Sequence, residues 1–321
     1  MQDVLERFAF DNICRVVFDM DPASLTIEGS DLMSSFAEAL DLLVNRFPVG
    51  FVWRAMKWLD IGSERRLRES IAKVKSHVTR IIHEKMENPS NNKSDLISHI
   101  ASSDQHTMEN LVDAVTNFMV AGRETTSTAM TWFFWLVSTR PDVEENILQK
   151  IRSLRNSTET SNEMIGYDEL REMNYLHASI TEAMRLYPPV AIDTKSCKED
   201  DTLPDGTVVK KGWLVSYHTY AMGRMEDIWG RDCSEYKPER WLENGVFKPE
   251  SPFKYPVFHA GPRMCLGKEM AYVQMKSIAA CLFERYKLEV VMEGGPNYGA
   301  RGTLKMTGGL PVKIARREHN M

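Results

Sequence analysis

Apolar side chains recur at intervals of three and four residues through the first two-thirds of the chain, which is the spacing of one helix face. This pattern predicts helices over residues 1–20, 63–87, 107–139 and 168–187. Pro22 ends the first helix and Pro188 the last, because proline lacks the backbone N–H that continues a helix. Residues 31–59 are also apolar and aromatic, with a break at Pro48-Val-Gly50.

The predicted helix over residues 63–87 is the most clearly amphipathic of these segments. Charged side chains cover most of its circumference, and apolar side chains form one stripe. We expect that stripe to be buried. It consists of Leu67, Ile71, Val74, Val78, Ile81 and Ile82.

Short strands replace helices in much of the last third of the chain. A turn at Leu203-Pro-Asp-Gly206 is followed by residues 207–209 and 213–217, which together predict a short hairpin. A helix returns at 267–286, and its predicted inner face carries Met270, Val273, Ser277, Ile278 and Cys281. Further strands are predicted at 287–291, 303–306 and 312–314. We therefore expect one mainly α domain over residues 1–321, with a small antiparallel β part.

Composition and charge narrow the class of protein. The chain has 321 residues, 43% of them hydrophobic, which is enough for a sizeable core. A net charge of −5 gives no indication of a nucleic-acid partner. No apolar leader follows Met1, and the longest uncharged run, over 125–139, is shorter than the roughly 17–25 residues of a membrane span. On this basis we expect the chain to be soluble or peripheral to a membrane.

The five cysteines do not follow the pattern of a disulfide framework or a zinc ribbon. They stand at positions 14, 197, 233, 265 and 281, an odd number with wide spacing and no Cys-x-x-Cys. A reducing compartment fits this distribution. One special cysteine could then act as a ligand, whereas Cys14, Cys197, Cys233 and Cys281 have unremarkable surroundings and are expected to be inert.

Cys265 lies in the segment Phe258-His-Ala-Gly-Pro-Arg-Met-Cys265-Leu-Gly267, which leads directly into a predicted helix. Gly261 and Gly267 allow a flat cofactor to approach the backbone closely. A sulfur at a helix N-terminus is favoured as thiolate, the form that binds ferric haem. Arg263 is placed to neutralise a carboxylate such as a haem propionate. The alternative, a buried structural cysteine before a helix, accounts poorly for this combination of five residues within ten positions: Phe258, Gly261, Arg263, Cys265 and Gly267.

The predicted helix over 107–139 contains Ala121-Gly-Arg-Glu124-Thr125-Thr126 at its centre. Glycine inside a helix costs roughly 1 kcal/mol relative to alanine, so Gly122 needs a reason. One reason is room for a ligand beside Ala121 and Gly122, with Glu124 and Thr125 delivering protons to dioxygen. The other is a packing glycine, threonine hydroxyls bonded to the backbone and a solvated Arg-Glu pair. Taken alone, this stretch leaves both readings open.

Glu182-Ala-Met-Arg185 places an acid and a base three residues apart on one helix face. Such pairs are usually surface features of small energetic value. The segment Tyr236-Lys-Pro-Glu-Arg240-Trp241 supplies a third partner, because Arg240 can complete a buried Glu-Arg-Arg network. We expect this network to hold the cysteine loop in place and to have no catalytic role.

These four motifs, in this order, resemble the cytochrome P450 family of haem-thiolate monooxygenases. Three segments are similar in sequence to the plant long-chain fatty-acid ω-hydroxylase branch of the family. They are residues 258–271, Tyr220-Ala-Met-Gly-Arg-Met-Glu226 and Leu203-Pro-Asp-Gly206. The resemblance implies insertion of one atom of O₂ into a C–H bond of a lipid-like substrate, with water as the other product. It also implies haem b as cofactor and electrons from NADPH through NADPH–cytochrome P450 reductase. Full-length members are expected at the cytosolic face of the endoplasmic reticulum membrane.

The resemblance also implies roles for individual residues. Cys265 would be the axial iron ligand, with Arg263 and Lys195 at the haem propionates and Glu124 and Thr125 as the catalytic pair. Residues implied to border the haem are Phe258, Gly261, Gly267, Ala121 and Gly122. A substrate pocket would be lined by Phe118, Met119, residues 190–192 and residues 306–310. Lys268 and Lys276 would meet acidic residues of the reductase.

Met1-Gln-Asp-Val-Leu-Glu-Arg-Phe resembles an internal helix of the family, so we expect the membrane anchor and first helices, about a third of the usual chain, to be absent. Three functions follow as hypotheses. The first is an active fatty-acid hydroxylase, and the second is an inactive haem-binding remnant or partial gene model of such an enzyme. The third is a hydroperoxide isomerase that uses no reductase, which the Glu124-Thr125 pair disfavours.

Overall fold

A computed structural model describes residues 1–26, 31–46, 52–87, 97, 107–157 and 165–317. The chain forms two compact units, Met1–Ser127 and Thr128–Met321, and each is described by itself. The expectation of one domain over the whole chain stays a prediction. None of the helices in the described ranges combines the length and apolar character needed to cross a bilayer.

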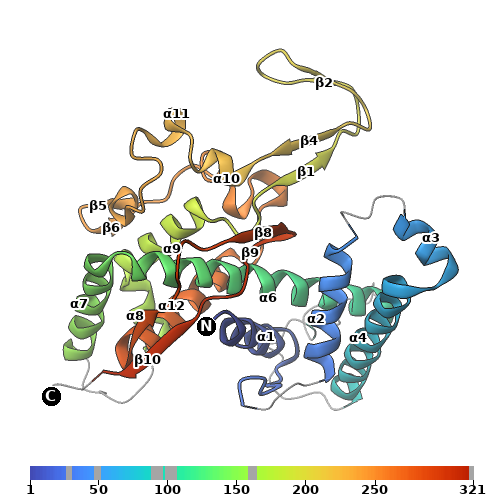
Figure 1. Ribbon diagram of the computed structural model, residues 1–321, viewed down its shortest axis with the longest axis horizontal. Coiled ribbons are helices and arrows are strands. Elements are labelled where there is room, and N and C mark those ends of the chain that lie inside the picture. The colour runs from blue at the N-terminus through green and yellow to red at the C-terminus, as the bar shows by residue number, and fades with distance from the viewer. Residues whose placement is uncertain (27–30, 47–51, 88–96, 98–106, 158–164, 318–321) are drawn as a thin grey trace. The chain divides into compact units, whose positions relative to one another are not determined.

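The first unit is entirely helical in its described residues (Figure 1). Helix α1 (Gln2–Phe18) ends where Asp19 adopts a left-handed conformation with φ 54°, just before the predicted stop at Pro22. Helix α2 (Asp31–Val44) lies along α4 (Gly62–Glu87), and α3 (Val52–Leu59) contacts α4 as well. The break predicted at Pro48-Val-Gly50 lies outside the described residues.

The buried face of α4 shows why this helix forms against α2. Leu67, Val74, Val78 and Ile82 are buried, as the sequence pattern predicts. The prediction is wrong for Ile71, which is 37% exposed. Glu64, in the first turn, is buried beside the partly exposed Arg46, whose Nε donates to its carboxylate at 2.7 Å. A partnered charge therefore occupies one end of a buried stripe whose other members, apart from Ser70, are apolar.

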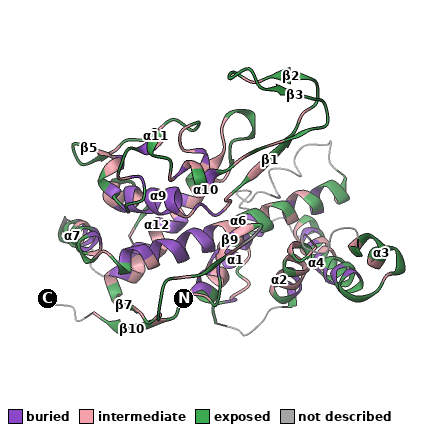
Figure 2. Cartoon of the chain, turned by 45° about the horizontal axis from the view of Figure 1, so that its top comes forward, coloured by how far each residue is buried: buried purple, intermediate pink, exposed green. Residues whose placement is uncertain are grey.

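Helix α6 (Met108–Ser138) is one continuous helix, as predicted, and the boundary between the two units falls within it. Its part in the second unit is buried over residues 128–134, which appears as an unbroken purple stretch in Figure 2. There Trp132 stacks on Tyr187 with ring centroids 3.9 Å apart, and its Nε1–H donates to the carbonyl of Leu304 at 2.7 Å. Helix α7 (Pro141–Ser157) follows directly.

The helix predicted over 168–187 is two helices, α8 (Tyr167–Glu172) and α9 (Asn174–Leu186). The backbone leaves the helical region at Met173, and the side chain of the next residue, Asn174, forms hydrogen bonds with the backbone of two other segments. Asn174 donates to the carbonyl of Glu172 at 3.2 Å and accepts from the backbone N–H of Phe247 at 3.0 Å. Helix α9 is buried from Ala178 to Leu186 and forms the centre of the second unit (Figure 2).

The β part consists of five two-stranded antiparallel sheets in the described residues. Strand β1 (Asp193–Ser196) pairs with β4 (Leu214–Tyr217), and β2 (Asp201–Thr202) pairs with β3 (Val208–Val209) across the turn at Leu203–Gly206. The predicted turn is therefore present. The predicted hairpin between 207–209 and 213–217 is wrong, because each of these strands pairs with an earlier one.

The remaining strands lie further along the second unit. Strand β5 (Leu242–Glu243) pairs with β6 (Val246–Phe247), and β8 (Tyr298–Arg301) pairs with β9 (Thr303–Met306). Strand β7 (Tyr286–Val290) pairs with β10 (Val312–Arg316). Two short helices, α10 (Thr219–Met222) and α11 (Glu226–Trp229), complete the unit (Figure 1). The predicted fold class, mainly α with a small antiparallel β part, is confirmed.

Helix α12 (Lys268–Arg285) has the predicted bounds but a different buried face. The sequence pattern predicted Met270, Val273 and Ser277 inside. The buried residues are instead Tyr272, Gln274, Met275, Lys276, Ala279, Ala280 and Phe283. The helix carries apolar residues of its own on all sides. The spacing of apolar positions alone therefore could not identify the side that packs against α9 and α7.

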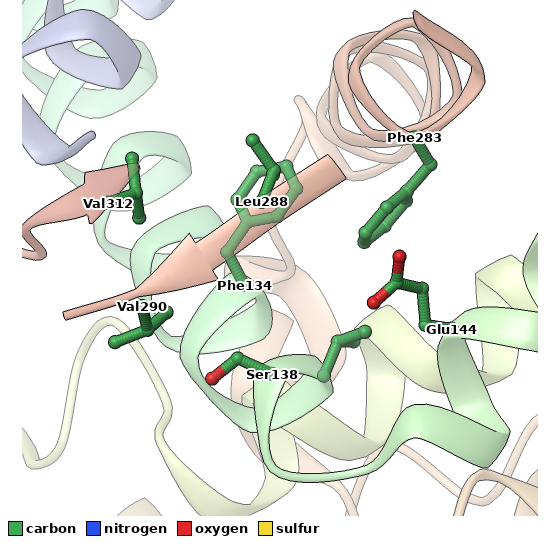
Figure 3. Close-up of a pocket in the computed structure, with 8 residues that line it drawn as sticks. Phe134, Ser138, Glu144, Phe283, Leu288, Val290 and Val312 are labelled. Carbon is green, nitrogen blue, oxygen red and sulfur yellow. The ribbon is translucent and has the colours of Figure 1, made fainter. Parts of the chain in front are cut away.

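A small pocket lies where the β7–β10 pair meets α6, α7 and α12 (Figure 3). Phe134, Phe283, Leu288, Val290 and Val312 line it, and Glu144 lies at its edge bonded to Arg317. The pocket measures about 260 Å³, open solvent included. It carries none of the residues that the sequence singled out for chemistry, and its apolar lining fits a gap in helix–sheet packing.

Candidate functional site

Cys265 differs from the other four cysteines in exposure. All five lie in the part of the chain that the structure describes; two are buried, two are half-buried, and Cys265 alone is exposed. Its own N–H donates to the carbonyl of Phe258 at 2.8 Å, and the N–H of Met264 donates to Gly261 at 3.0 Å. These two bonds close a compact loop that holds the thiol at the surface, just before Gly267 and α12.

The loop around Cys265 presents an open and partly apolar face. Residues 261–266 are all exposed, and Leu266 reaches 91%. Gly261 has φ 67°, a conformation that side chains disfavour, and a Cβ there would meet nothing within 4 Å. A Cβ on Gly267 would lie 3.9 Å from the sulfur. Because neither glycine carries a side chain, the surface of the loop beside the thiol has room for a large flat group to approach.

The donors of this loop fit a haem with thiolate ligation. Cys265 supplies a thiolate ligand, the exposed Leu266 and Met264 offer apolar contact, and Arg263 offers a cation for a carboxylate. Arg263 is exposed and forms no ion pair with another described residue. The predicted residues Cys265, Arg263, Phe258, Gly261 and Gly267 thus share one loop. Their contacts with a cofactor stay predictions.

Glu182 is the buried centre of the network that the sequence predicted. Both its side chain and that of Arg185 are completely buried, with Nε and Nη2 of Arg185 donating at 2.7 and 2.8 Å. Nε of Arg240 donates to the same carboxylate at 3.3 Å. The sequence missed Trp241, whose Nε1–H donates to Glu182 at 2.8 Å. We call these four residues the Glu182 network.

The remaining donors of the two arginines tie the network to the backbone. Arg185 donates to the carbonyls of Cys233 at 2.6 Å and Glu235 at 2.9 Å, and also to that of Gly223. A Cβ on Gly223 would lie 2.2 Å from the carbonyl oxygen of Arg185, so the close approach requires glycine at this position. Arg240 donates to Trp229 and Asp232, each at 3.0 Å. Nearly every charge is therefore paired, which a buried ion network needs to be tolerated.

A chain of aromatic contacts leads from the Glu182 network to the cysteine loop. The ring of Trp241 packs edge-on against Tyr255 with centroids 4.8 Å apart, and Tyr255 donates to the carbonyl of Thr181 at 3.1 Å. The hydroxyls of Thr181 and Tyr272 lie 2.9 Å apart, and the ring of Tyr272 lies 5.4 Å from that of Phe258. Because the carbonyl of Phe258 accepts from the N–H of Cys265, the contact between Phe258 and Tyr272 joins the cysteine loop to α12.

His177 lies between the rings of Tyr272 and Phe247. Its imidazole is 4.0 Å from the ring of Tyr272 and 4.0 Å from that of Phe247. Burial, followed by the charges of Lys276 and Lys268, lowers the pKa of His177 from 6.5 to about 3. The side chain therefore acts as a neutral aromatic spacer at physiological pH.

Lys276 does not have the role that the resemblance implied. It is only 5% exposed, and its Nζ donates to the carbonyl of Leu170 at 2.5 Å. A side chain buried in this way cannot meet a reductase, so the prediction is wrong for Lys276. It is not tested for Lys268, which is half-buried.

The predicted catalytic residues Glu124 and Thr125 belong to the first unit. Nη1 of the buried Arg123 donates to Glu124 at 2.6 Å, and its Nη2 donates to Glu6 at 3.1 Å. The hydroxyl of Thr125 donates to the carbonyl of Ala121, one turn earlier, at 2.6 Å. Arg123 is therefore not the solvated partner of the alternative reading, whereas the threonine bond to the backbone is present. The catalytic role of the pair stays a prediction.

Gly122 has a packing reason for its missing side chain. A Cβ at this position would lie 2.8 Å from Cδ1 of Ile13 in α1, closer than real side chains approach. The glycine therefore lets α6 and α1 come together, as the packing alternative for this motif proposed. Ala121, its neighbour, is exposed. The expectation that both residues border the haem stays a prediction.

Lys195 lies on β1, and its Nζ pairs with Asp193 on the same strand. Its predicted role at a haem propionate is not tested. The structure adds three residues that the sequence did not indicate, Asp193, Tyr217 and His259. Nδ1 of His259 lies 2.5 Å from the hydroxyl of Tyr217, which also lies 3.0 Å from Asp193. No local sequence signal joins these positions, since 66 residues separate the first from the last.

His259 has an unusual backbone for a residue with a side chain. Its φ of 62° with ψ of −179° falls in a region that is essentially restricted to glycine and costs of order 1–3 kcal/mol. The residue directly follows Phe258, whose carbonyl closes the cysteine loop. The strain is thus located at the hinge where the loop begins.

Comparison with known proteins agrees with this fold and these motifs. Residues 1–307 match the family model "Cytochrome P450", so the chain belongs to the cytochrome P450 family. It is 44% identical to cytochrome P450 CYP94D108 of Paris polyphylla over 99% of the chain and 65% of that protein. It is 43% identical to cytochrome P450 94A1 of Vicia sativa, over 99% of the chain and 63% of the relative. Cytochrome P450 94B1 of Arabidopsis thaliana is 44% identical over 99% and 64%.

The comparisons confirm the resemblance to a plant branch of the family, since these three relatives are plant proteins with the number 94 in their names. The chain spans about two thirds of the length of these relatives. Membership of the family implies a haem-thiolate cofactor, and the exposed Cys265 loop fits one. The activity, substrate and partners of the whole protein are treated below as proposals.

The environment of His177 predicts a pH dependence of stability. Between pH 6.5 and about 3, the unfolded chain binds a proton at His177 that the folded chain does not. The free energy of unfolding should therefore fall as the pH falls through this window, by up to about 1.4 kcal/mol per pH unit. Replacing His177→Phe keeps a ring between Phe247 and Tyr272 and removes this contribution. Urea unfolding at pH 7, 6 and 5 measures the slope, and an equal slope in both proteins would contradict the account.

Proposed function

We propose that this protein is a haem-dependent monooxygenase that inserts one atom of O₂ into a C–H bond of a lipid-like substrate. The substrate we favour is a fatty acid, hydroxylated at or near its terminal carbon. NADPH would supply electrons through NADPH–cytochrome P450 reductase. We place the enzyme at the cytosolic face of the endoplasmic reticulum membrane, as the resemblance to the plant branch implies.

The observation that carries this proposal is the exposure of Cys265 in a closed loop before α12. A thiolate ligand donates electron density to haem iron, and the bound haem would thereby supply the cleavage of O₂ and the transfer of one oxygen atom. Arg263, two residues before Cys265 and exposed, would hold a propionate. Backbone hydrogen bonds from Cys265 to Phe258 and from Met264 to Gly261 restrain the backbone of the loop that carries the sulfur.

Glu124 and Thr125 would hold and move protons. Arg123, itself buried, donates to the carboxylate of Glu124 at 2.6 Å and so holds it in place. The hydroxyl of Thr125 uses its proton in the bond to Ala121, which leaves oxygen lone pairs to accept from water. Such a hydroxyl can receive a proton on one side while it donates on the other, as a relay requires.

Apolar residues at the positions implied for the substrate pocket support a lipid-like substrate, each considered within its own unit. Phe118 and Ala121 lie one turn apart on α6 and are accessible, and the segment 190–192 presents Val190, Ala191 and the half-exposed Ile192. Apolar walls with few polar groups suit an alkyl chain. The segment 306–310, also predicted to line the pocket, is less accessible at its ends. Met306 and Leu310 are each only 2% exposed.

The first test is a carbon monoxide difference spectrum of the reduced, haem-loaded protein. We expect the long-wavelength band of a thiolate-bound haem in the natural chain and its loss in Cys265→Ala. Cys281→Ala is the matched control, because this half-buried cysteine lies within α12, away from the loop that carries Cys265, and its loss should leave the band unchanged. No band in the natural chain would contradict the proposed function for this chain.

The second test addresses substrate and proton delivery together. The protein is incubated with a plant reductase, NADPH and fatty acids of different length, and products are identified by mass spectrometry. Thr125→Ala should lower product formed per NADPH consumed, on the order of 100-fold for a lost proton-transfer group. The haem spectrum should not change, because Thr125 is not an iron ligand.

Thr116→Ala is the control for this second test. Thr116 lies on the same helix and makes the same kind of bond, with its hydroxyl donating to the carbonyl of Val112 at 2.8 Å. It should retain full product yield. Equal losses in both variants would show that the effect is structural, and absence of ω-hydroxylated products would move the proposal to another lipid-like substrate.

A further inference from the structure

The cysteine loop is held at its start by a hydrogen-bonded bridge from the β1–β4 pair. We define the Tyr217 bridge as Asp193 on β1, Tyr217 on β4 and His259 at the beginning of the loop. Asp193 and Tyr217 face each other in the strand register, and the hydroxyl of Tyr217 lies 3.0 Å from Oδ2 of Asp193. The same hydroxyl lies 2.5 Å from Nδ1 of His259.

The directions of these hydrogen bonds follow from the number of protons. A phenol has one proton and an ionised carboxylate has none, so Tyr217 donates to Asp193 and its oxygen accepts from Nδ1–H of His259. Burial acts to raise the pKa of Asp193, but hydrogen bonds from Lys195 and Tyr217 outweigh it and keep the pKa below its usual value. Burial and the bond to Asp193 raise the pKa of Tyr217 to about 12. At neutral pH, Asp193 is therefore ionised and Tyr217 is neutral, as these hydrogen-bond directions require.

The bridge acts on a residue that needs a restraint. His259 has φ 62° and ψ −179°, where glycine alone is comfortable. Such a conformation persists only where surrounding contacts determine it, and the imidazole supplies one such contact. The N–H of His259 also donates to Pro256 at 2.9 Å, so the residue is fixed through both backbone and side chain.

We propose that Tyr217 and Asp193 are positioning residues for Cys265, acting through His259 on the loop that carries the sulfur. This inference rests on the proposed role of Cys265 as a haem ligand. By fixing the hinge next to Phe258, the bridge orients the carbonyl that accepts from the N–H of Cys265. Lys195, paired with Asp193, is part of the same assembly on β1.

Hydrogen exchange of the Cys265 amide in the chain without haem tests the positioning role directly. Tyr217→Phe removes the hydroxyl and keeps the ring, so exchange should become about five- to ten-fold faster at Cys265. Tyr220→Phe is the matched control, because its hydroxyl lies 2.9 Å from that of Tyr298 and has no link to the loop. Unchanged exchange in Tyr217→Phe, or equal acceleration in the control, would overturn the proposal.

Two variants of His259 separate restraint from strain. Both His259→Gly and His259→Ala lose the bridge, but glycine adopts φ 62° without strain and alanine does not. We expect faster exchange at Cys265 in both variants and a larger loss of stability to urea in the alanine variant. Equal stability would contradict the strain assigned to this hinge, and slow exchange in both would contradict the restraint.

The haem-loaded protein supplies a second readout. Tyr217→Phe should keep haem bound but reduce the fraction in the long-wavelength, thiolate-bound form by at least about twofold relative to Tyr220→Phe, because a looser loop holds the sulfur less well. If the natural chain lacks this band, the proposed function fails, whereas the exchange comparison still decides whether the Tyr217 bridge positions the loop. An unchanged band in Tyr217→Phe would contradict the link from bridge to ligand.

Discussion

The buried carboxylate of Glu182 is the interaction on which the second unit depends. A charge that is fully removed from water is tolerated only when donors surround it, and here Arg185, Arg240 and Trp241 all donate to it. Arg185 lies on α9 together with Glu182, whereas Arg240 and Trp241 come from a segment that has little regular structure of its own. The network therefore fixes residues 223–241 against α9, where a hydrophobic core alone would specify their positions less sharply.

The cysteine loop packs next to the segments that the Glu182 network fixes, although none of its residues belongs to that network. Trp241 and Tyr255 connect the Glu182 network to the start of the loop, while Tyr272 and Phe258 connect α12 to the carbonyl that holds Cys265. The Tyr217 bridge restrains the strained His259 from a third side. The loop that carries the exposed sulfur is thus restrained by contacts from several segments, as the proposed role of Cys265 as a ligand requires.

Local patterns predicted the elements well where packing follows one helix face. Leu67, Val74 and Val78 are buried as expected, and the bounds of α6 and α12 agree with the sequence. The inner face of α12 was wrong because apolar residues lie on all its sides, so only its neighbours decide between Val273 and Met275. Strand pairing failed for a similar reason, since a polar strand such as β1 gives no local sign of its partner.

The site was predictable where residues lie close in sequence and unpredictable where the chain folds back on itself. The Glu182–Arg185 pair follows from helical spacing, and Arg240 was identified from its motif. Trp241 as a fourth partner, the Tyr217 bridge and the positive φ of His259 depend on contacts between distant segments. Gly122 shows the opposite case, in which a residue expected to face a ligand has a packing reason that only Ile13 reveals.

The central claim is that the charge of Glu182 holds together the frame that carries Cys265. Equilibrium urea unfolding of Glu182→Gln tests it most directly, because glutamine keeps the shape and removes the charge. We predict a loss of about 3–5 kcal/mol in the free energy of unfolding, since Arg185 would be left buried without a counter-charge. Glu243→Gln, an exposed pair with Lys248, serves as the control and should change stability little. A stability equal to that of the natural chain in Glu182→Gln would contradict the account.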